Sequence, residues 1–369
     1  MKVPFNYLPY QFNKPKKYFR EWGKLIKSTE FTLGPYVEKF EKKFAKFIGV
    51  KHALSTSSCT GALEISLLAL DIGPGDEVIV PDLTWVATAS AVLRVGATPV
   101  FADVELDSWT IDPNSIKKQI TNRTKAIIVV HLYGHPSKMD NILLLSKKYK
   151  IKIIEDAAPA IGAKWKNQKC GSFGSFAAFS FQGAKLLVAG EGGMLVTNNT
   201  KLYNKAYKIW NQGRNLNKQF WIDGKGVKYK MSNMQAAFGY SQISRVEEHI
   251  LMKRRIFKWY FDNLKDIDSI KLNKEVHYAK SIYWMTSLFI KDHKKFSVNK
   301  LTKTLSKNNI DSRYLFPAIS QYPIWGKKYI PQTNALILSK NSINLPSGVT
   351  LTKEHIDYIC NVINNFFIK

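Results

Sequence analysis

One lysine stands out in the stretch Phe179–Thr197, which reads FSFQGAKLLVAGEGGMLVT. Lys185 lies between two apolar runs, with small residues directly before it and a turn rich in glycine, 190–193, after it. This pattern places Lys185 after a buried strand, expected over 177–181, where it faces an interior cleft. Burial disfavours the ammonium form, which lowers the pKa of a lysine and leaves a nucleophilic amine. The alternative is a loop lysine that extends its ammonium group into solvent.

An aspartate upstream could work together with this lysine. The largely apolar segment 151–154 predicts a buried strand, and Asp156 follows at its carboxyl end, where open α/β sheets place their ligands. Pyridoxal phosphate chemistry requires such a pair: the acid holds a proton on the pyridine nitrogen, and the lysine carries the aldehyde carbon. An aspartate in this position is more often a helix cap or a metal ligand. The interpretation therefore depends on the combination of Asp156 and Lys185.

Two further segments supply groups that this cofactor would need. Residues 57–63 read SSCTGAL and open a helix expected to run to about Leu70. The free N–H groups at that end form an anion site, although an ordinary N-cap gives the same pattern. Ser180 could add a hydroxyl group to the same phosphate. Trp85, in the loop after the expected strand 77–80, could stack on a pyridine ring, although core packing is the commoner role of a tryptophan.

These residues require a scaffold that brings several strand ends together. Short apolar runs predict strands at 77–80, 99–102, 126–130, 151–154, 177–181 and 194–197, with helices such as 86–95 and 141–149 between them. An earlier helix carries its apolar face on Val37, Phe40, Phe44 and Phe47 and ends near Gly49. Strands that alternate with helices predict an α/β architecture.

The pattern changes after about Arg254. Segments 282–290 and 298–306 and a final helix from about Lys353 to Phe367 indicate a smaller α+β domain. We therefore expect a large domain over residues 1–253 and a small one over 254–369. The N-terminal segment could pack on the small domain. A chain of 369 residues is long enough for both.

Together these motifs resemble those of the DegT-type sugar-nucleotide aminotransferases. That family carries S-F-x-x-x-K followed by G-E-G-G, matched here by 180–185 and 190–193. It also carries an E-D-A-A strand end, matched by 155–158, and a phosphate turn that ends in T-x-A-L, matched by 60–63. The similarity extends to 81–85, 131–136 and 229–237 and covers roughly Phe31 to Phe367.

The resemblance implies the fold of the type-I pyridoxal-phosphate-dependent transferases, with a mostly parallel mixed sheet, helices on both faces and a smaller C-terminal α+β domain. It implies that Lys185 binds pyridoxal 5'-phosphate covalently, that Asp156 pairs with the pyridine nitrogen and that Trp85 stacks on the ring. The implied phosphate ligands are Cys59, Thr60, Ser180 and, from the neighbouring subunit of a homodimer, Lys228.

The resemblance also implies the reaction. Glutamate is the amino donor, pyridoxamine phosphate is the intermediate form of the cofactor, and a nucleotide-linked keto-6-deoxysugar accepts the amino group in amino-sugar and polysaccharide biosynthesis. In the perosamine-type members a sugar-contacting segment corresponds to 313–320, so the expected substrate residues are Arg313, Tyr314, Phe316 and Ser320.

The chain departs from the family pattern at three places. Pro159 stands where members usually carry Gln, His or Glu near the cofactor hydroxyl, and proline offers no such hydrogen bond. Lys228 and Lys230 replace an asparagine and an arginine; lysine keeps the attraction to phosphate without the planar geometry. Ser320 replaces a sugar-contacting histidine. The hexose, the nucleotide base and the aminated carbon therefore stay open.

Composition bounds the other possibilities. The net charge of +27 comes from lysines spread along the whole chain, with no recognisable nucleic-acid-binding motif, so we expect no nucleic-acid partner. Three cysteines are too few for a disulfide framework, and no apolar run approaches the roughly 20 residues of a membrane helix, so we expect a cytoplasmic protein without membrane insertion or a metal. Two alternatives remain: a related sugar dehydratase, in which a histidine replaces this lysine, and a non-catalytic basic binding protein that has kept the fold.

Overall fold

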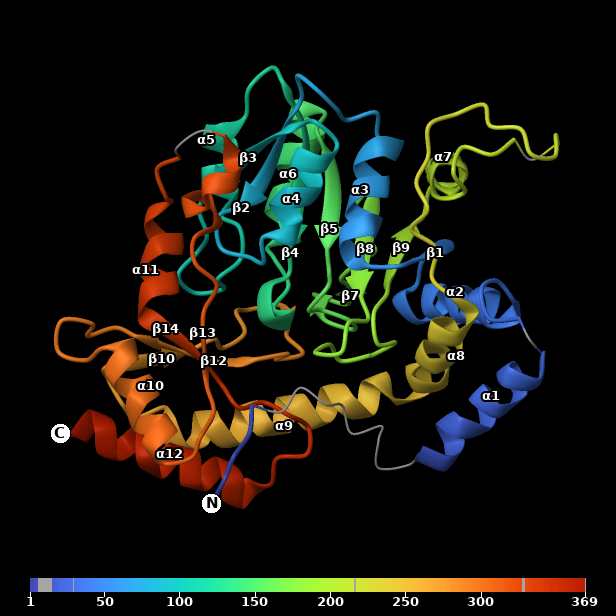
Figure 1. Cartoon of the computed structure of the whole chain (residues 1–369). Helices are drawn as coiled ribbons and strands as arrows, with labels where there is room; N and C mark the ends of the chain where they lie inside the picture. The colour runs from blue at the N-terminus through green and yellow to red at the C-terminus, as the bar shows by residue number, and fades with distance from the viewer. Residues whose placement is uncertain (6–14, 29, 216, 327–328, 369) are drawn as a thin grey trace.

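A mixed seven-stranded sheet forms the centre of the fold (Figure 1). The computed structural model describes residues 1–5, 15–28, 30–215, 217–326 and 329–368. The strand order is β1-β9-β8-β5-β4-β2-β3, and β9 runs antiparallel to both neighbours while the other pairs are parallel. The strands are β1 (His52–Thr56), β2 (Glu77–Pro81), β3 (Thr98–Ala102), β4 (Thr124–Val130), β5 (Lys152–Asp156), β8 (Phe176–Ser180) and β9 (Gly193–Thr197).

Every strand predicted from the sequence is present, with ends shifted by at most two residues, and β1 is an addition. The apolar residues of these strands alternate between two faces, both of which are buried. In β4, for example, Ile128 packs into one apolar cluster, whereas Ile127 and Val129 pack into another. This is the pattern expected of a parallel sheet that is covered by helices on both sides.

The helices of this part follow the predicted alternation. They are α3 (Cys59–Ala69), α4 (Ala87–Arg94), α5 (Pro113–Gln119), α6 (Met139–Tyr149) and α7 (Thr200–Trp210). The predicted early helix is α2 (Pro35–Ile48), and its end is fixed by Gly49, which adopts a left-handed conformation with φ of 89° and donates its N–H to the Ala45 carbonyl. Its neighbours are α1 (Pro15–Ser28) and α8 (Asn233–Gln242), which pack against each other (Figure 1).

The C-terminal part has its own four-stranded antiparallel sheet, in the order β10-β12-β14-β13. Its strands are β10 (Ile270–Leu272), β12 (Thr286–Ile290), β13 (Arg313–Tyr314) and β14 (Ser342–Leu345). Its helices are α10 (Val298–Lys307), α11 (Thr333–Asn341) and α12 (Lys353–Ile368). The chain start joins this part, because Val3 pairs with Ile310 and exchanges backbone hydrogen bonds with Asn309 and Asp311.

No linker separates the two parts at the expected boundary after residue 253. Helix α9 (Val246–Leu264) crosses it without a break and runs along the base of both parts (Figure 1). A small three-stranded sheet also spans them, because β11 (Ala279–Lys280) pairs with β6 (Lys164–Trp165), which pairs with β7 (Gln168–Lys169). Short 3-10 segments complete the fold: η2 (Leu132–Gly134), η3 (Ile243–Arg245), η4 (Ile319–Gln321) and η5 (Pro323–Trp325). None of the described helices is long and apolar enough to cross a bilayer.

Candidate active site

A cavity of about 510 Å³ lies where the parallel strands end. Its lining includes the last residues of β4, β5 and β8, the loop after β2 and the start of α3. The structure brings seven of the expected site residues to this cavity: Cys59, Thr60, Trp85, Asp156, Ser180, Lys185 and Phe316. The topology explains this meeting, because the carboxyl ends of parallel strands share one edge of the sheet.

Lys185 lies on the connection between β8 and β9 and points into the cavity. Its backbone N–H donates to the Gln182 carbonyl at 2.8 Å. Its ammonium nitrogen lies 4.0 Å from the centre of the Trp284 ring, and the Trp284 indole N–H donates to the Ala184 carbonyl at 2.8 Å. Burial lowers the pKa of Lys185, and the nearby charge of Asp156 opposes this effect. The site therefore favours an amine that can change its protonation state.

Asp156, the last residue of β5, is held by donors on three sides. Its Oδ2 accepts from the Thr88 hydroxyl at 2.8 Å, and its Oδ1 accepts from the Ala158 N–H at 3.2 Å and faces the Cys59 thiol at 3.9 Å. Burial raises the pKa of Asp156, while the hydrogen bonds from Thr88 and Ala158 and the charge of Lys185 work in the opposite direction. The carboxylate is thus fixed in orientation and lies in the cavity lining.

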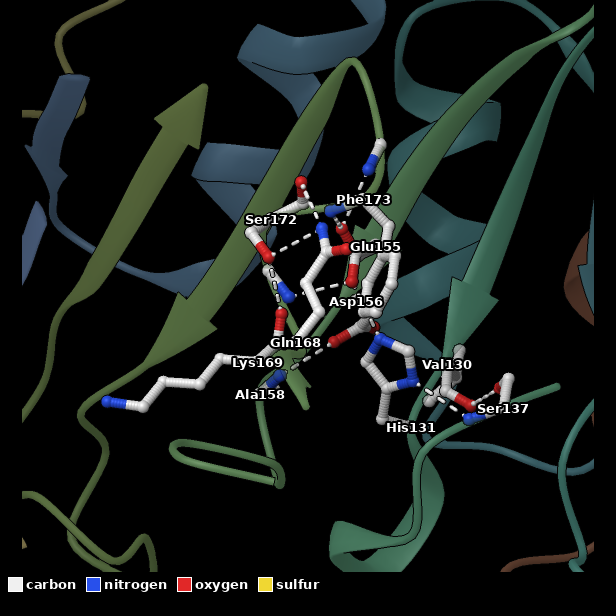
Figure 2. A network of polar contacts seen from close by, with 12 residues as sticks. Val130, His131, Ser137, Glu155, Asp156, Ala158, Gln168, Lys169, Ser172 and Phe173 are labelled. Carbon is white, nitrogen blue, oxygen red and sulfur yellow. Dashed lines mark hydrogen bonds and ion pairs between the residues drawn. The ribbon is translucent and has the colours of Figure 1, made fainter. Parts of the chain in front are cut away.

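The neighbouring Glu155 anchors this strand end (Figure 2). Its fully buried carboxylate accepts from the Gly171 N–H at 2.7 Å and from the Phe173 and Gly174 N–H groups at 2.8 Å. The fourth partner is His131, whose Nε2 lies 3.0 Å from Glu155 Oε2.

The protonation of that histidine follows from its other neighbour. The Ser137 N–H donates to His131 Nδ1 at 3.1 Å, so Nε2 carries the ring hydrogen and donates to Glu155 (Figure 2). The sequence motif contained Glu155, but nothing in it identified these four donors. No group of three or more possible metal ligands occurs among the described residues.

The start of α3 forms the floor of the cavity near β9. The Ser58 side chain caps the helix by accepting the Gly61 N–H at 3.1 Å. Cys59 and Thr60 lie in the first turn, where backbone N–H groups have no carbonyl partner within the helix. Gly193 permits the close approach of β9, because a Cβ atom there would lie 2.6 Å from the Cys59 nitrogen. The first turn therefore presents N–H groups of the kind that bind an anion.

Aromatic side chains form the outer wall of the cavity. Trp85 is 58% exposed, and its ring centre lies 5.5 Å from that of Phe316. Phe316 stacks with Tyr133 at 5.8 Å, and Tyr133 stacks with Trp284 at 6.1 Å. Trp284 was not predicted, because it comes from the C-terminal part and its position depends on long-range packing.

Four expected site residues do not line this cavity. Ser320 is buried and hydrogen-bonds to Asp82 through both its N–H and its hydroxyl group. Arg313 and Tyr314 form the exposed edge strand β13. Lys228 is exposed between two residues that are tied to the body of the fold: the Val227 N–H donates to the Ile209 carbonyl at 2.8 Å, and the Tyr229 carbonyl accepts the Ser57 N–H at 2.7 Å.

Comparison with known proteins identifies relatives of the whole chain. The model of the DegT/DnrJ/EryC1/StrS aminotransferase family matches residues 14–364. The chain is 38% identical to GDP-perosamine synthase of Escherichia coli O157:H7 over 362 residues, with 98% of each chain covered, and 35% identical to GDP-perosamine synthase of Caulobacter vibrioides, with 91% of each covered. Among solved structures, S. venezuelae DesV in complex with a ketimine intermediate superimposes with a TM-score of 0.93 at 28% identity, covering 100% of this chain and 99% of that one. The chain therefore belongs to the DegT/DnrJ/EryC1/StrS aminotransferase family.

Proposed function

We propose that this protein is a pyridoxal-phosphate-dependent aminotransferase that transfers an amino group from glutamate to a keto-6-deoxysugar linked to a nucleotide. It would act in the cytoplasm as a homodimer, in amino-sugar and polysaccharide biosynthesis. The observation that carries the proposal is the meeting of Lys185 and Asp156 in one cavity beside the first turn of α3. A dehydratase of this family is disfavoured because Lys185 occupies the position that a histidine takes in that branch.

The residues present fit the cofactor. The first turn of α3, with Cys59 and Thr60, and the Ser180 hydroxyl would receive its phosphate, since the helix dipole and free N–H groups favour an anion. The carboxylate of Asp156 is pre-oriented by Thr88 and would hold a proton on the ring nitrogen. When bound, pyridoxal phosphate supplies an aldehyde carbon and a ring that accepts electrons.

Lys185 has two tasks in this proposal. Its amine would hold the cofactor covalently until the donor displaces it. The freed amine would then take up a proton as a base and return it as an acid. Burial favours the neutral base. The face of Trp284, 4.0 Å away, favours the ammonium form and so stabilises the acid. Trp85 would cover the ring, whereas Pro159 can donate no hydrogen bond to the cofactor hydroxyl.

The first experiment replaces this lysine. Lys185→Ala should keep the folded state but lose activity by orders of magnitude, because the nucleophile is gone. Borohydride reduction of the wild-type holoenzyme should label Lys185, as located by peptide mass. Lys201→Ala, which removes an exposed lysine on α7, is the matched control and should retain activity. Activity in Lys185→Ala, or a label on another lysine, would contradict the assignment.

The charges of the cavity support a shared site. Among the described lining residues, Lys185 is the only cation, and Asp156 and Glu191 are anions. A glutamate donor and a cofactor phosphate together bring several negative charges, so further cations must come from outside this lining. Lys228 is exposed and lies outside this lining, and a twofold dimer would bring it to the partner's site reciprocally. A solvated loop lysine is the alternative.

Mixing two inactive variants tests the shared site. When Lys185→Ala and Lys228→Glu exchange subunits, the hybrid contains one site with both lesions and one with neither, so part of the activity should return. A monomer by light scattering at the working concentration, or unchanged cofactor affinity in Lys228→Glu, would contradict it. The substrate itself is tested with a panel of nucleotide-linked keto-sugars and glutamate, with the products followed by mass.

A further inference from the structure

A buried carboxylate behind the cavity wall joins two distant segments of the chain. Asp82 follows β2 directly and is fully buried. Its Oδ1 accepts the Ser320 N–H at 2.8 Å, and its Oδ2 accepts the Ser320 hydroxyl at 2.9 Å and the Gln332 N–H at 2.8 Å. Its own carbonyl accepts the Ile319 N–H at 2.8 Å. We call these four hydrogen bonds the Asp82 clamp.

The clamp connects two aromatic side chains that pack against each other in the cavity lining. Trp85 lies three residues after Asp82, and Phe316 lies four residues before Ser320 in the other segment. Both rings line the cavity, with centres 5.5 Å apart. Trp325 reports on the same segment, because its indole N–H donates to the Ile319 carbonyl at 2.7 Å. The separation of the two rings thus depends on a group that lies outside the cavity lining.

The charge of Asp82 has no partner among the cations that the structure describes. No ion pair within the described ranges includes it. A charged group that acts on Asp82 is Asp103, which directly follows β3. The Asp103 carboxylate accepts the N–H groups of Asn334 and Ala335, at the start of α11, at 3.0 Å. The groups that hydrogen-bond to Asp82 from η4 and from the residue before α11 are uncharged and belong to Ser320 and Gln332.

This environment brings the titration of Asp82 into the working range of an enzyme. Burial and, to a smaller extent, the charge of Asp103 raise the pKa of Asp82 to about 6, against the opposing effect of the hydrogen bonds from Gln332 and Ser320. The ionised group presents acceptors to three hydrogen atoms. When one oxygen takes up a proton, the carboxyl group loses its charge and accepts more weakly, so the hydrogen bonds from Ser320 and Gln332 weaken.

We propose that Asp82 is a positioning residue whose ionised carboxylate holds Trp85 and Phe316 at the separation that the sugar substrate requires. The inference rests on the proposed function only for the identity of that substrate. Ser320 then serves the wall of the cavity rather than contacting the sugar. As the pH falls through the range around 6, the clamp loosens and the sugar binds more weakly.

A spectroscopic experiment tests the clamp without any substrate. The holoenzyme is labelled with 5-fluorotryptophan, and the Trp85 and Trp325 resonances are assigned from single Trp→Phe variants. Between pH 8 and pH 5 both resonances should shift with a midpoint near 6 in the wild type and stay constant in Asp82→Asn. Trp259, on α9 away from the clamp, serves as the internal control and should not follow this midpoint.

Kinetics then test the consequence for the sugar. With the panel member that gives the highest turnover, Asp82→Asn should raise KM for the sugar about tenfold and should abolish the pH dependence of KM. Ser320→Ala should raise KM two- to threefold and move the midpoint to higher pH, because a hydrogen bond that favours the ionised form is lost. Ser339→Ala, on α11 but outside the clamp, is the matched control.

Two results would overturn the proposal. Fluorine resonances of Trp85 and Trp325 that do not change between pH 8 and pH 5 would show that Asp82 does not control the wall. A Ser320→Ala variant with a reduced kcat and an unchanged midpoint would place its hydroxyl group on the sugar instead. If no keto-sugar is turned over, the proposed function fails, and the fluorine titration still decides the role of Asp82. If Asp82→Asn does not fold, the wild-type titration and Ser320→Ala decide it.

Discussion

Replacing Glu155 by glutamine tests whether this residue anchors the strand end that carries Asp156. The change keeps the size of the side chain but replaces one acceptor oxygen by an NH2 group. Because Glu155 accepts two donors on each oxygen, either orientation of the amide leaves two buried donors facing another donor. The His131 ring cannot relieve the conflict, because its Nδ1 already accepts the Ser137 N–H.

The size of the effect follows from this count. Each buried donor left without an acceptor costs about 1–3 kcal/mol, so two of them should lower the free energy of unfolding by about 2–6 kcal/mol. No cavity contributes, since the two side chains have nearly the same volume. The measurement is urea-induced unfolding followed by circular dichroism, in which the midpoint should fall while the dependence on urea concentration stays the same.

The matched control is Glu38→Gln, which removes the charge of an exposed glutamate that pairs with Lys42. Its unfolding midpoint should equal that of the wild type within error, because exposed ion pairs stabilise little. A loss below about 1 kcal/mol in Glu155→Gln would refute the reasoning, since it would mean that the loop 171–174 or water supplies other acceptors at little cost.

Three further predictions concern the cavity and its surroundings. Asp156→Asn should lower kcat by at least about 100-fold, measured in the overall transamination, because the ring nitrogen would lose its proton. Gly193→Ala should weaken cofactor binding in an absorbance titration, because its Cβ would lie 2.5 Å from the Ser58 carbonyl carbon and displace the start of α3; Gly23→Ala, with open space around it, is the control. Glu41→Gln should raise the unfolding midpoint at pH 8 and leave it unchanged near pH 4. Burial raises the pKa of Glu41 to about 7, so the folded state binds a proton that the unfolded state has already released. The wild type therefore loses stability as the pH rises from about 4.5 to 7. Equal midpoints at pH 8 would contradict that sign.

The sequence predicted the parts of the fold that depend on local pattern. The strand ends at Asp156 and Ser180 and the start of α3 follow from apolar runs, turns and capping residues, and the order of these elements then brings them to one edge. This reasoning identified Lys185, Asp156 and the residues of the first turn, all of which line the cavity.

What the sequence did not predict depends on contacts between distant segments. Trp284 reaches Lys185 from the C-terminal part, and no local signal marks it. Ser320 was expected at the sugar because of a motif position, whereas the structure places its hydroxyl group on Asp82, which is far away in the sequence. The continuity of α9 across the expected domain boundary was hidden for the same reason: a change of composition near Arg254 does not interrupt a helix.

The position of β1 at the edge of the large sheet affects how the protein folds during translation. Its five residues, His52–Thr56, pair only with β9, His52 with Thr197 at one end and Thr56 with Gly193 at the other. Translation proceeds at about 5–20 residues per second, so β1 leaves the ribosome on the order of ten seconds before its partner exists. During that interval the buried face of β1, with Leu54, has no sheet to join.

The start of α3 follows β1 directly and shares this delay. Pairings between distant segments form late, because the intervening chain must first be ordered. The first turn that would receive a phosphate is therefore among the last pieces to be fixed. A nascent chain that stops before β9 can contain Asp156 and even Lys185, but the start of α3 beside them is not yet fixed. We therefore expect the cofactor to bind only after β9 has been synthesised.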